Sequence, residues 1–84
     1  MTAKEMFEEL GYKQIEKAEN SVRYEGQPTM IGAYVFYIEI WKREEMDDFL
    51  IRKATIHREY VSNIFGKELQ AINKQVEELG WNKC

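Results

Sequence analysis

The sequence predicts an α+β domain in which two helices flank a four-stranded antiparallel sheet, in the order α-β-β-β-β-α. The run Glu-Glu-Leu-Gly followed by an aromatic residue occurs near both ends, at residues 8–12 and 77–81. A glycine after such a run is typical of a helix end. Between these ends β-branched and aromatic residues are frequent, which favours strands. The connections between strands are short, so an antiparallel meander is the simplest topology.

Composition indicates one folded, soluble domain that spans residues 1–84. The chain is 44% hydrophobic and 32% charged, with a single proline, which is unlike a disordered chain. Eighty-four residues build only one small core. The net charge of -3 gives no general attraction to nucleic acid or to an acidic membrane surface.

The single cysteine, Cys84, has no partner for an internal disulfide or a zinc site, which fits a reducing compartment. The N-terminal residues show no export signal. The longest nearly uncharged apolar stretch, residues 30–38, is much shorter than the roughly 20 residues of a membrane helix. We therefore expect a cytoplasmic protein without membrane contact.

Both helices are predicted from spacing and capping. Thr2 and Glu5 form a capping box, and apolar residues at positions 3, 6, 7 and 10 predict a helix over 3–10. Apolar residues at positions 69, 72, 76 and 79 predict a second helix over 67–79. Gly66 is its expected cap and Gly80 its expected end.

Four segments have strand character. They are residues 12–17, 21–25, 31–41 and 49–61. A turn at 18–20, a loop at 26–29 and a charged turn at 42–48 separate them. The last strand would be about 43 Å long at ~3.3 Å per residue, which exceeds the usual length, so we expect a bend or bulge near Thr55.

The third strand is apolar on both faces, which is unusual where one face of a sheet is wet. The two helices, about 12 and 20 Å long, suffice for one face only. We therefore expect the face of Val35, Tyr37 and Trp41 to bind another protein, a second copy of this chain being one candidate. The alternative is that the helices divide between the faces, or that the aromatic rings pack beside long charged side chains.

Single-stranded nucleic acid is the alternative partner. Arg52, Lys53, His57 and Arg58 make the fourth strand locally basic, beside the aromatic third strand. Residues 33–37 match the last five positions of the RNP1 pattern, but its first three positions do not match, and the order of elements lacks the internal helices of an RRM.

Catalytic and metal-binding patterns are weak. The acidic run at residues 44–48 lacks the spacing of an EF-hand and is best interpreted as a solvated hairpin tip. A hydrolytic triad would require His57, Ser62 and an aspartate of the turn, yet no nucleophile motif surrounds either serine of the chain. We therefore expect no enzyme, no cofactor and no metal.

Residues 68–81 and 3–12 together resemble small uncharacterised proteins encoded by bacteriophages and prophages of Gram-positive bacteria. The resemblance implies a bacterial host cell as the setting, and it carries over no activity and no site residue. We thus expect a small accessory protein that acts by protein binding.

Overall fold

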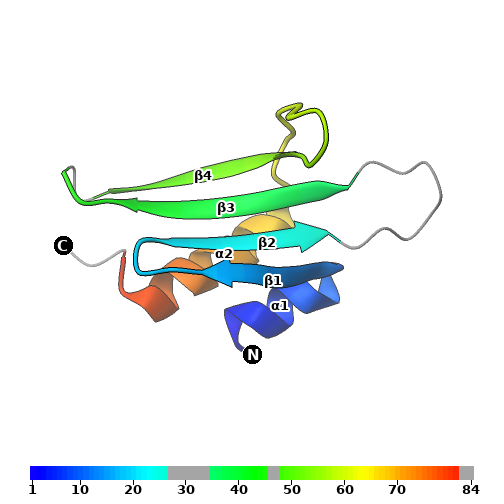
Figure 1. Cartoon of the computed structure of the whole chain (residues 1–84). Coiled ribbons are helices and arrows are strands. Elements are labelled where there is room, and N and C mark those ends of the chain that lie inside the picture. Colours follow the sequence, from blue (N-terminus) through cyan, green and yellow to red (C-terminus); the bar gives the residue numbers. More distant parts are fainter. Residues whose placement is uncertain (27–34, 46–47, 82–84) are drawn as a thin grey trace.

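The computed structural model describes residues 1–26, 35–45 and 48–81, and it confirms the α+β meander. The elements are α1 (Ala3–Glu9), β1 (Tyr12–Lys17), β2 (Ser21–Gly26), β3 (Phe36–Arg43), β4 (Asp48–Thr55) and α2 (Gly66–Leu79). The strands form one antiparallel sheet in the order β1-β2-β3-β4. Both helices lie on the same face of the sheet (Figure 1). Among the described residues, neither helix has the length and apolar character of a membrane span.

The repeated Glu-Glu-Leu-Gly sequence ends a helix at each site, as predicted. Gly11 and Gly80 have φ angles of 89° and 74°, in the left-handed region that favours glycine. The N–H groups of Gly80 and Trp81 bond to the carbonyl oxygens of Glu77 and Val76, which is the pattern of a Schellman motif. The repeat is therefore architectural.

The core lies between the helices and the sheet. The Phe7 and Tyr24 rings stack with their centroids 3.8 Å apart, and both side chains are fully buried. The Tyr24 hydroxyl contacts the amide oxygens of Gln75 and Gln14. Burial and nearby carboxylates raise the pKa of Tyr24 to about 12. These contacts tie α1 and α2 to the centre of the sheet.

A buried ion pair joins β4 to α2. Lys53 Nζ lies 2.8 Å from Glu68 Oε1 and 3.0 Å from Oε2, and both side chains are buried. The Tyr12 hydroxyl and the Phe65 N–H also donate to this carboxylate, at 2.7 and 2.9 Å. Burial alone would raise the pKa of Glu68, but the hydrogen bonds from Lys53, Phe65 and Tyr12 outweigh it and lower this pKa.

The observed strand boundaries at the β3–β4 hairpin differ from the predicted ones. β3 continues to Arg43 and β4 begins at Asp48, so the connection is tighter than the predicted turn at 42–48. Residues 31–34 of the predicted third strand, and the predicted loop beyond Gly26, lie outside the described residues. An unpredicted irregularity in β1 shifts the register between Gln14 and Glu16.

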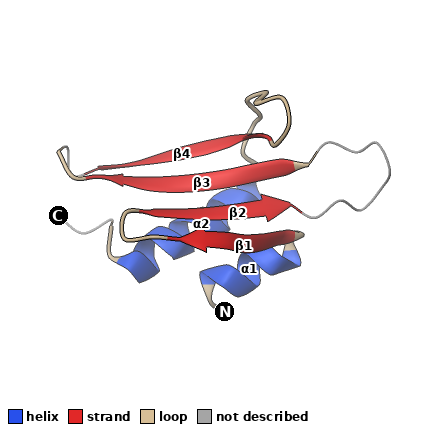
Figure 2. Cartoon of the chain, viewed as in Figure 1, coloured by secondary structure: helices blue, strands red, loops and turns tan. Residues whose placement is uncertain are grey.

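The fourth strand ends where a bend was expected. β4 stops at Thr55, so the prediction of a bend near this residue is confirmed, and a continuous strand to residue 61 is wrong. Figure 2 shows a long loop between β4 and α2. Within this loop Glu59 has a φ of 55°, and Val61 returns to form a single antiparallel bridge with Ala54. The left-handed residue reverses the chain, which a continuous strand cannot do.

Candidate functional site: the open face of the sheet

One face of the sheet has no helix over it within the described residues (Figure 1). Its side chains alternate with those of the core along each strand, and the strand register aligns them in rows. We call this surface the open face. It is formed by Ser21, Arg23 and Glu25 of β2, Tyr37, Glu39 and Trp41 of β3, and Leu50, Arg52 and Ala54 of β4.

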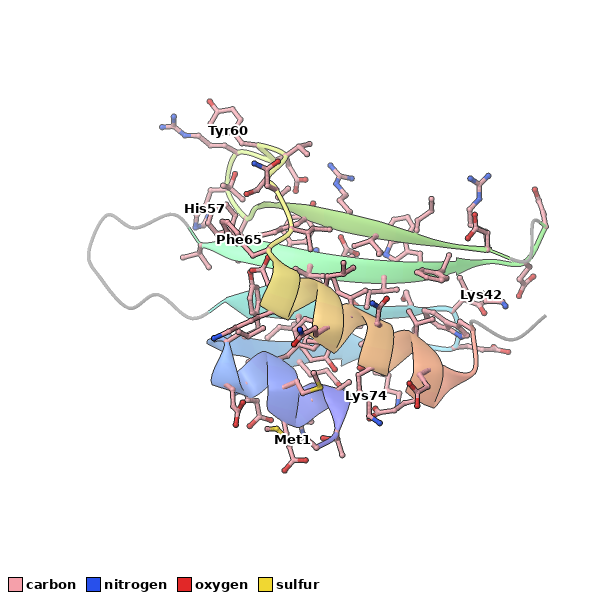
Figure 3. The ribbon with its side chains drawn as sticks, turned by 180° about the vertical axis from the view of Figure 1, so that it is seen from behind. Met1, Lys42, His57, Tyr60, Phe65 and Lys74 are labelled. Atoms are coloured by element: carbon pink, nitrogen blue, oxygen red, sulfur yellow. The ribbon has the colours of Figure 1, made fainter. Side chains whose placement is uncertain are left out.

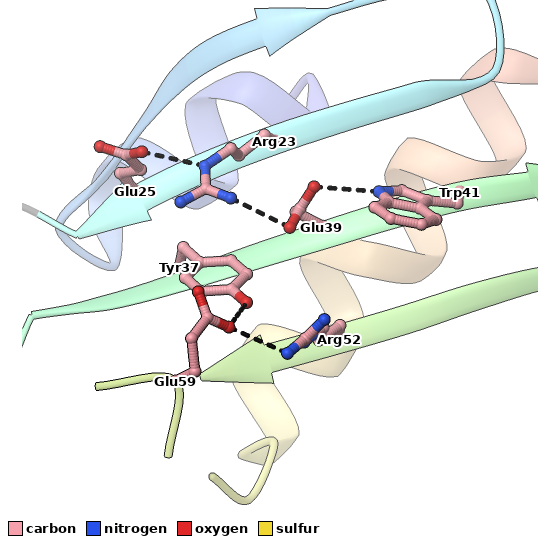
Figure 4. A network of polar contacts seen from close by, with 7 residues as sticks. All are labelled: Arg23, Glu25, Tyr37, Glu39, Trp41, Arg52 and Glu59. Carbon is pink, nitrogen blue, oxygen red and sulfur yellow. Dashed lines mark hydrogen bonds and ion pairs between the residues drawn. The ribbon is translucent and has the colours of Figure 1, made fainter. Parts of the chain in front are cut away.

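A network of ion pairs and hydrogen bonds crosses the open face (Figure 4). Arg23 binds Glu25 through Nε at 2.9 Å and Glu39 through Nη1 at 3.0 Å. The other oxygen of Glu39 accepts a hydrogen bond from Trp41 Nε1–H at 3.0 Å. Glu39 therefore holds the indole ring in one orientation.

Tyr37 lies on the open face but is only 1% exposed. The guanidinium carbon of Arg23 is 4.0 Å from the centroid of its ring, a distance typical of a cation–π contact. The Tyr37 hydroxyl donates to Glu59 Oε2 at 2.6 Å, and Arg52 binds the same oxygen at 2.9 Å. Burial and the bond to Glu59 raise the pKa of Tyr37. Charged side chains thus cover this ring.

Replacing Tyr37 by phenylalanine is expected to lower the free energy of unfolding by about 1 kcal/mol, because the partly buried hydrogen bond to Glu59 is lost while the ring remains. Urea denaturation followed by circular dichroism measures this loss. Tyr60→Phe is the matched control, since Tyr60 is 56% exposed and its variant should unfold like the native chain. Equal stability of the two variants would contradict the role given to the Glu59 contact.

Trp41 and Leu50 form the exposed apolar part of the open face. They are cross-strand partners, 44% and 45% exposed. Together with Glu39, Ile51 and Arg52 they line a hollow of about 290 Å³. An apolar floor between two opposite charges can accept an apolar side chain and orient polar groups around it.

The predicted protein-binding residues differ in accessibility. Trp41 is exposed, and Val35 is partly buried just before β3, where its carbonyl accepts a bond from the Ile56 N–H. Tyr37 belongs to the open face but is buried beneath charged side chains, so a partner could not contact it directly. Leu50 was missed because its position opposite Trp41 depends on the β3–β4 register. One signal in the sequence could have indicated it: side chains alternate along the fourth strand, which places Leu50 on the same face as Arg52.

Of the four residues predicted to contact nucleic acid, Lys53 is not available on the surface. Arg52 lies on the open face, but the next residue, Lys53, points into the core and is bound to Glu68. His57 and Arg58 are exposed in the turn beyond β4, and Figure 3 shows His57 in that region. Successive residues of a strand face opposite sides, so four basic residues near one another in sequence do not form one patch.

The candidate catalytic and acidic residues form no centre in the described chain. Asp48 and the turn that holds His57 lie at opposite ends of β4, roughly 20 Å apart at ~3.3 Å per residue, and Asp47 lies outside the described residues. Glu44 at the hairpin tip accepts a hydrogen bond from Asn20 Nδ2 at 3.0 Å. No group of three metal-binding side chains occurs in the described part of the chain.

The chain is a small α+β protein with both described helices on one side of a meander and a polar surface with an apolar hollow on the other. No family model, no curated protein and no solved structure matches the chain.

Proposed function

We propose that this protein acts by binding another protein through its open face, without catalysis. The observation that carries the proposal is the half-exposed Trp41–Leu50 pair on the face that the described helices leave uncovered. Tryptophan is enriched among the residues that contribute most to binding energy, especially where polar groups surround it. Here Glu39 and Arg52 supply the polar rim.

The size of the hollow supports a protein partner over a small ligand. Its volume of about 290 Å³ lies at the lower limit of small-molecule sites, which span roughly 300–1,000 Å³. The charged groups beside it are already partly engaged, since Glu39 binds Arg23 and Arg52 binds Glu59. An apolar side chain from a partner would fill the hollow without displacing these ion pairs.

The proposed setting is the cytoplasm of a bacterial host, where the protein serves a phage or prophage as an accessory factor. The resemblance of residues 3–12 and 68–81 to phage-encoded proteins supports this setting. The single cysteine is consistent with it.

The test is capture of host proteins from a bacterial lysate with the native chain and with Trp41→Ala. We expect one protein to be retained by the native chain and at least tenfold less by the variant, because loss of a central tryptophan costs about 2 kcal/mol or more. Retention should survive nuclease and added salt, since counterion release makes nucleic-acid binding salt-sensitive.

The matched control is Phe65→Ala, which removes an aromatic ring that is 66% exposed outside the open face. It should capture the same protein as the native chain. Circular dichroism verifies that both variants fold. Equal capture by the native and Trp41→Ala chains, or loss of capture after nuclease treatment, would count against the proposal.

A further inference from the structure

β4 lies at one edge of the sheet, so a row of its main-chain groups faces away from β3. The Lys53 carbonyl and the Thr55 N–H point to this outer side, because they bond to the segment 60–62. Main-chain direction alternates along a strand, so the N–H and C=O groups of Phe49 and Ile51 face the same way. In the described part of the chain, no strand pairs with them.

The two edges of the sheet differ in regularity. In β1 the register shifts between Gln14 and Glu16, and such irregularities hinder the addition of another strand. β4 pairs with β3 from Asp48 to Thr55 without a shift. Its free part, residues 48–52, is therefore a regular template for another strand.

We propose that two copies of this chain pair through β4, antiparallel, about a twofold axis at Leu50. The free edge is bounded by the β3–β4 connection at one end and by the Val61–Ala54 bridge at the other. Leu50 is its centre, so two copies overlap over its full length. Phe49 then forms a hydrogen-bonded pair with the partner's Ile51, and Leu50 faces the partner's Leu50.

The charges of β4 select this register. With the axis at Leu50, Asp48 lies opposite the partner's Arg52 on both sides of the axis. An axis at Asp48 or at Arg52 would oppose like charges. An axis at Phe49 or Ile51 would place a charge opposite a leucine. The edge is therefore complementary to itself in one register only.

The contacts within one chain are compatible with this pairing. Asp48 Oδ1 accepts the Phe49 N–H at 2.8 Å in an exposed contact. The carbonyl of the partner's Ile51 would replace it and release the Asp48 carboxylate for the partner's Arg52. Arg52 uses Nη2 for Glu59, and a guanidinium carries five donors, so both carboxylates can be bound at once.

The pairing shares Leu50 and Arg52 with the hollow of the proposed binding site, but Trp41 and Asp48 separate the two. The Trp41 side chain projects from the open face and leaves the edge free, so Trp41→Ala should lose the partner protein and retain the dimer. Asp48→Arg, which changes the edge outside the hollow, should do the reverse.

Sedimentation velocity tests whether the dimer forms, and cysteine cross-linking tests whether its twofold axis lies at Leu50. We expect a monomer–dimer equilibrium with a dissociation constant between about 1 μM and 1 mM, as is typical of a small interface. In a Cys84→Ser background, Leu50→Cys should form a disulfide-linked dimer under mild oxidation, because facing residues lie within the ~7 Å that a disulfide spans. Arg52→Cys should not, since its copies would be about 13 Å apart. A monomer at all concentrations, or equal cross-linking at both positions, would overturn the proposal.

Charge exchange tests the register. Asp48→Arg alone and Arg52→Asp alone each place like charges opposite one another twice, and each should weaken the dimer about tenfold or more. The double variant Asp48→Arg/Arg52→Asp restores opposite charges and should restore the native dissociation constant to within about threefold. Single variants that dimerise like the native chain, or a double variant as weak as the singles, would contradict the register.

Discussion

Replacing Glu68 by glutamine is expected to lower the free energy of unfolding by about 3–5 kcal/mol, a large part of the stability of a small domain. The change leaves the Lys53 ammonium group buried without its counter-ion, 4% exposed between the sheet and α2. It also replaces one of the two carboxylate oxygens by an amide nitrogen, which donates and cannot accept. Urea denaturation at pH 7 measures the loss.

Glu77→Gln is the matched control, because the Glu77 carboxylate is 67% exposed and lies 3.9 Å from Lys74. The free energy of unfolding of this variant should fall by less than about 0.5 kcal/mol. The double variant Lys53→Met/Glu68→Gln removes the unpaired charge and should be more stable than Glu68→Gln alone. A loss under about 1 kcal/mol for Glu68→Gln would show that the pair contributes little.

The same pair makes stability depend on pH on the acidic side. The pKa of Glu68 is lower in the folded chain than the ordinary value near 4.3 of an unfolded one. The unfolded state therefore binds the proton more readily. The contribution of Glu68 is complete above the unfolded pKa and is lost as the pH falls through the folded pKa. Between pH 6 and pH 3, the native chain should lose more stability than Glu68→Gln.

Replacing Phe7 by alanine is expected to cost about 3–5 kcal/mol, because it leaves a cavity against a ring that cannot move to fill it. The Tyr24 ring that stacks on Phe7 is held at its hydroxyl end by Gln75 and Gln14. The Tyr12 ring packs edge-on against Phe7, with 6.0 Å between centroids, and is held by its bond to Glu68. Thermal and urea unfolding measure the effect.

Phe65→Ala is the control of the same chemical type. Phe65 is 66% exposed, and its ring contacts Lys53 Nζ, which lies 4.7 Å from the centroid. The loss should be at most about 1 kcal/mol. Comparable losses in Phe7→Ala and Phe65→Ala would mean that the core near α1 relaxes around the missing ring.

The parts of the fold that were predictable are those set by neighbouring residues. The glycines at 11 and 80 require left-handed angles, and the capping box of Thr2 and Glu5 fixes the start of α1. Sequence also indicated a bend near Thr55, because an unbroken strand over 49–61 would exceed the usual length, although it did not predict that the strand ends there.

The composition of the open face depended on contacts between distant residues. Tyr37 is covered by Arg23 from β2 and by Glu59 from a turn that the sequence did not indicate. Lys53 was assigned to a basic surface because its partner, Glu68, is 15 residues away on another element. Leu50 became part of the site only through its register with Trp41. Short-range patterns contain none of this information.

The Lys53–Glu68 pair also acts as a check on strand alignment. If β4 slipped by one residue against β3, every side chain of β4 would change face. Lys53 would then leave Glu68, and either Arg52 or Ala54 would take its place beside the carboxylate. With Ala54 in that place, the Glu68 carboxylate would be buried without a counter-ion. With Arg52, the bulkier guanidinium would have to fit the space that the Lys53 ammonium group occupies beside the rings of Phe36 and Phe65. Misaligned chains would thus leave a buried charge unpaired or poorly packed, so we expect the pair to favour a single alignment of the sheet during folding.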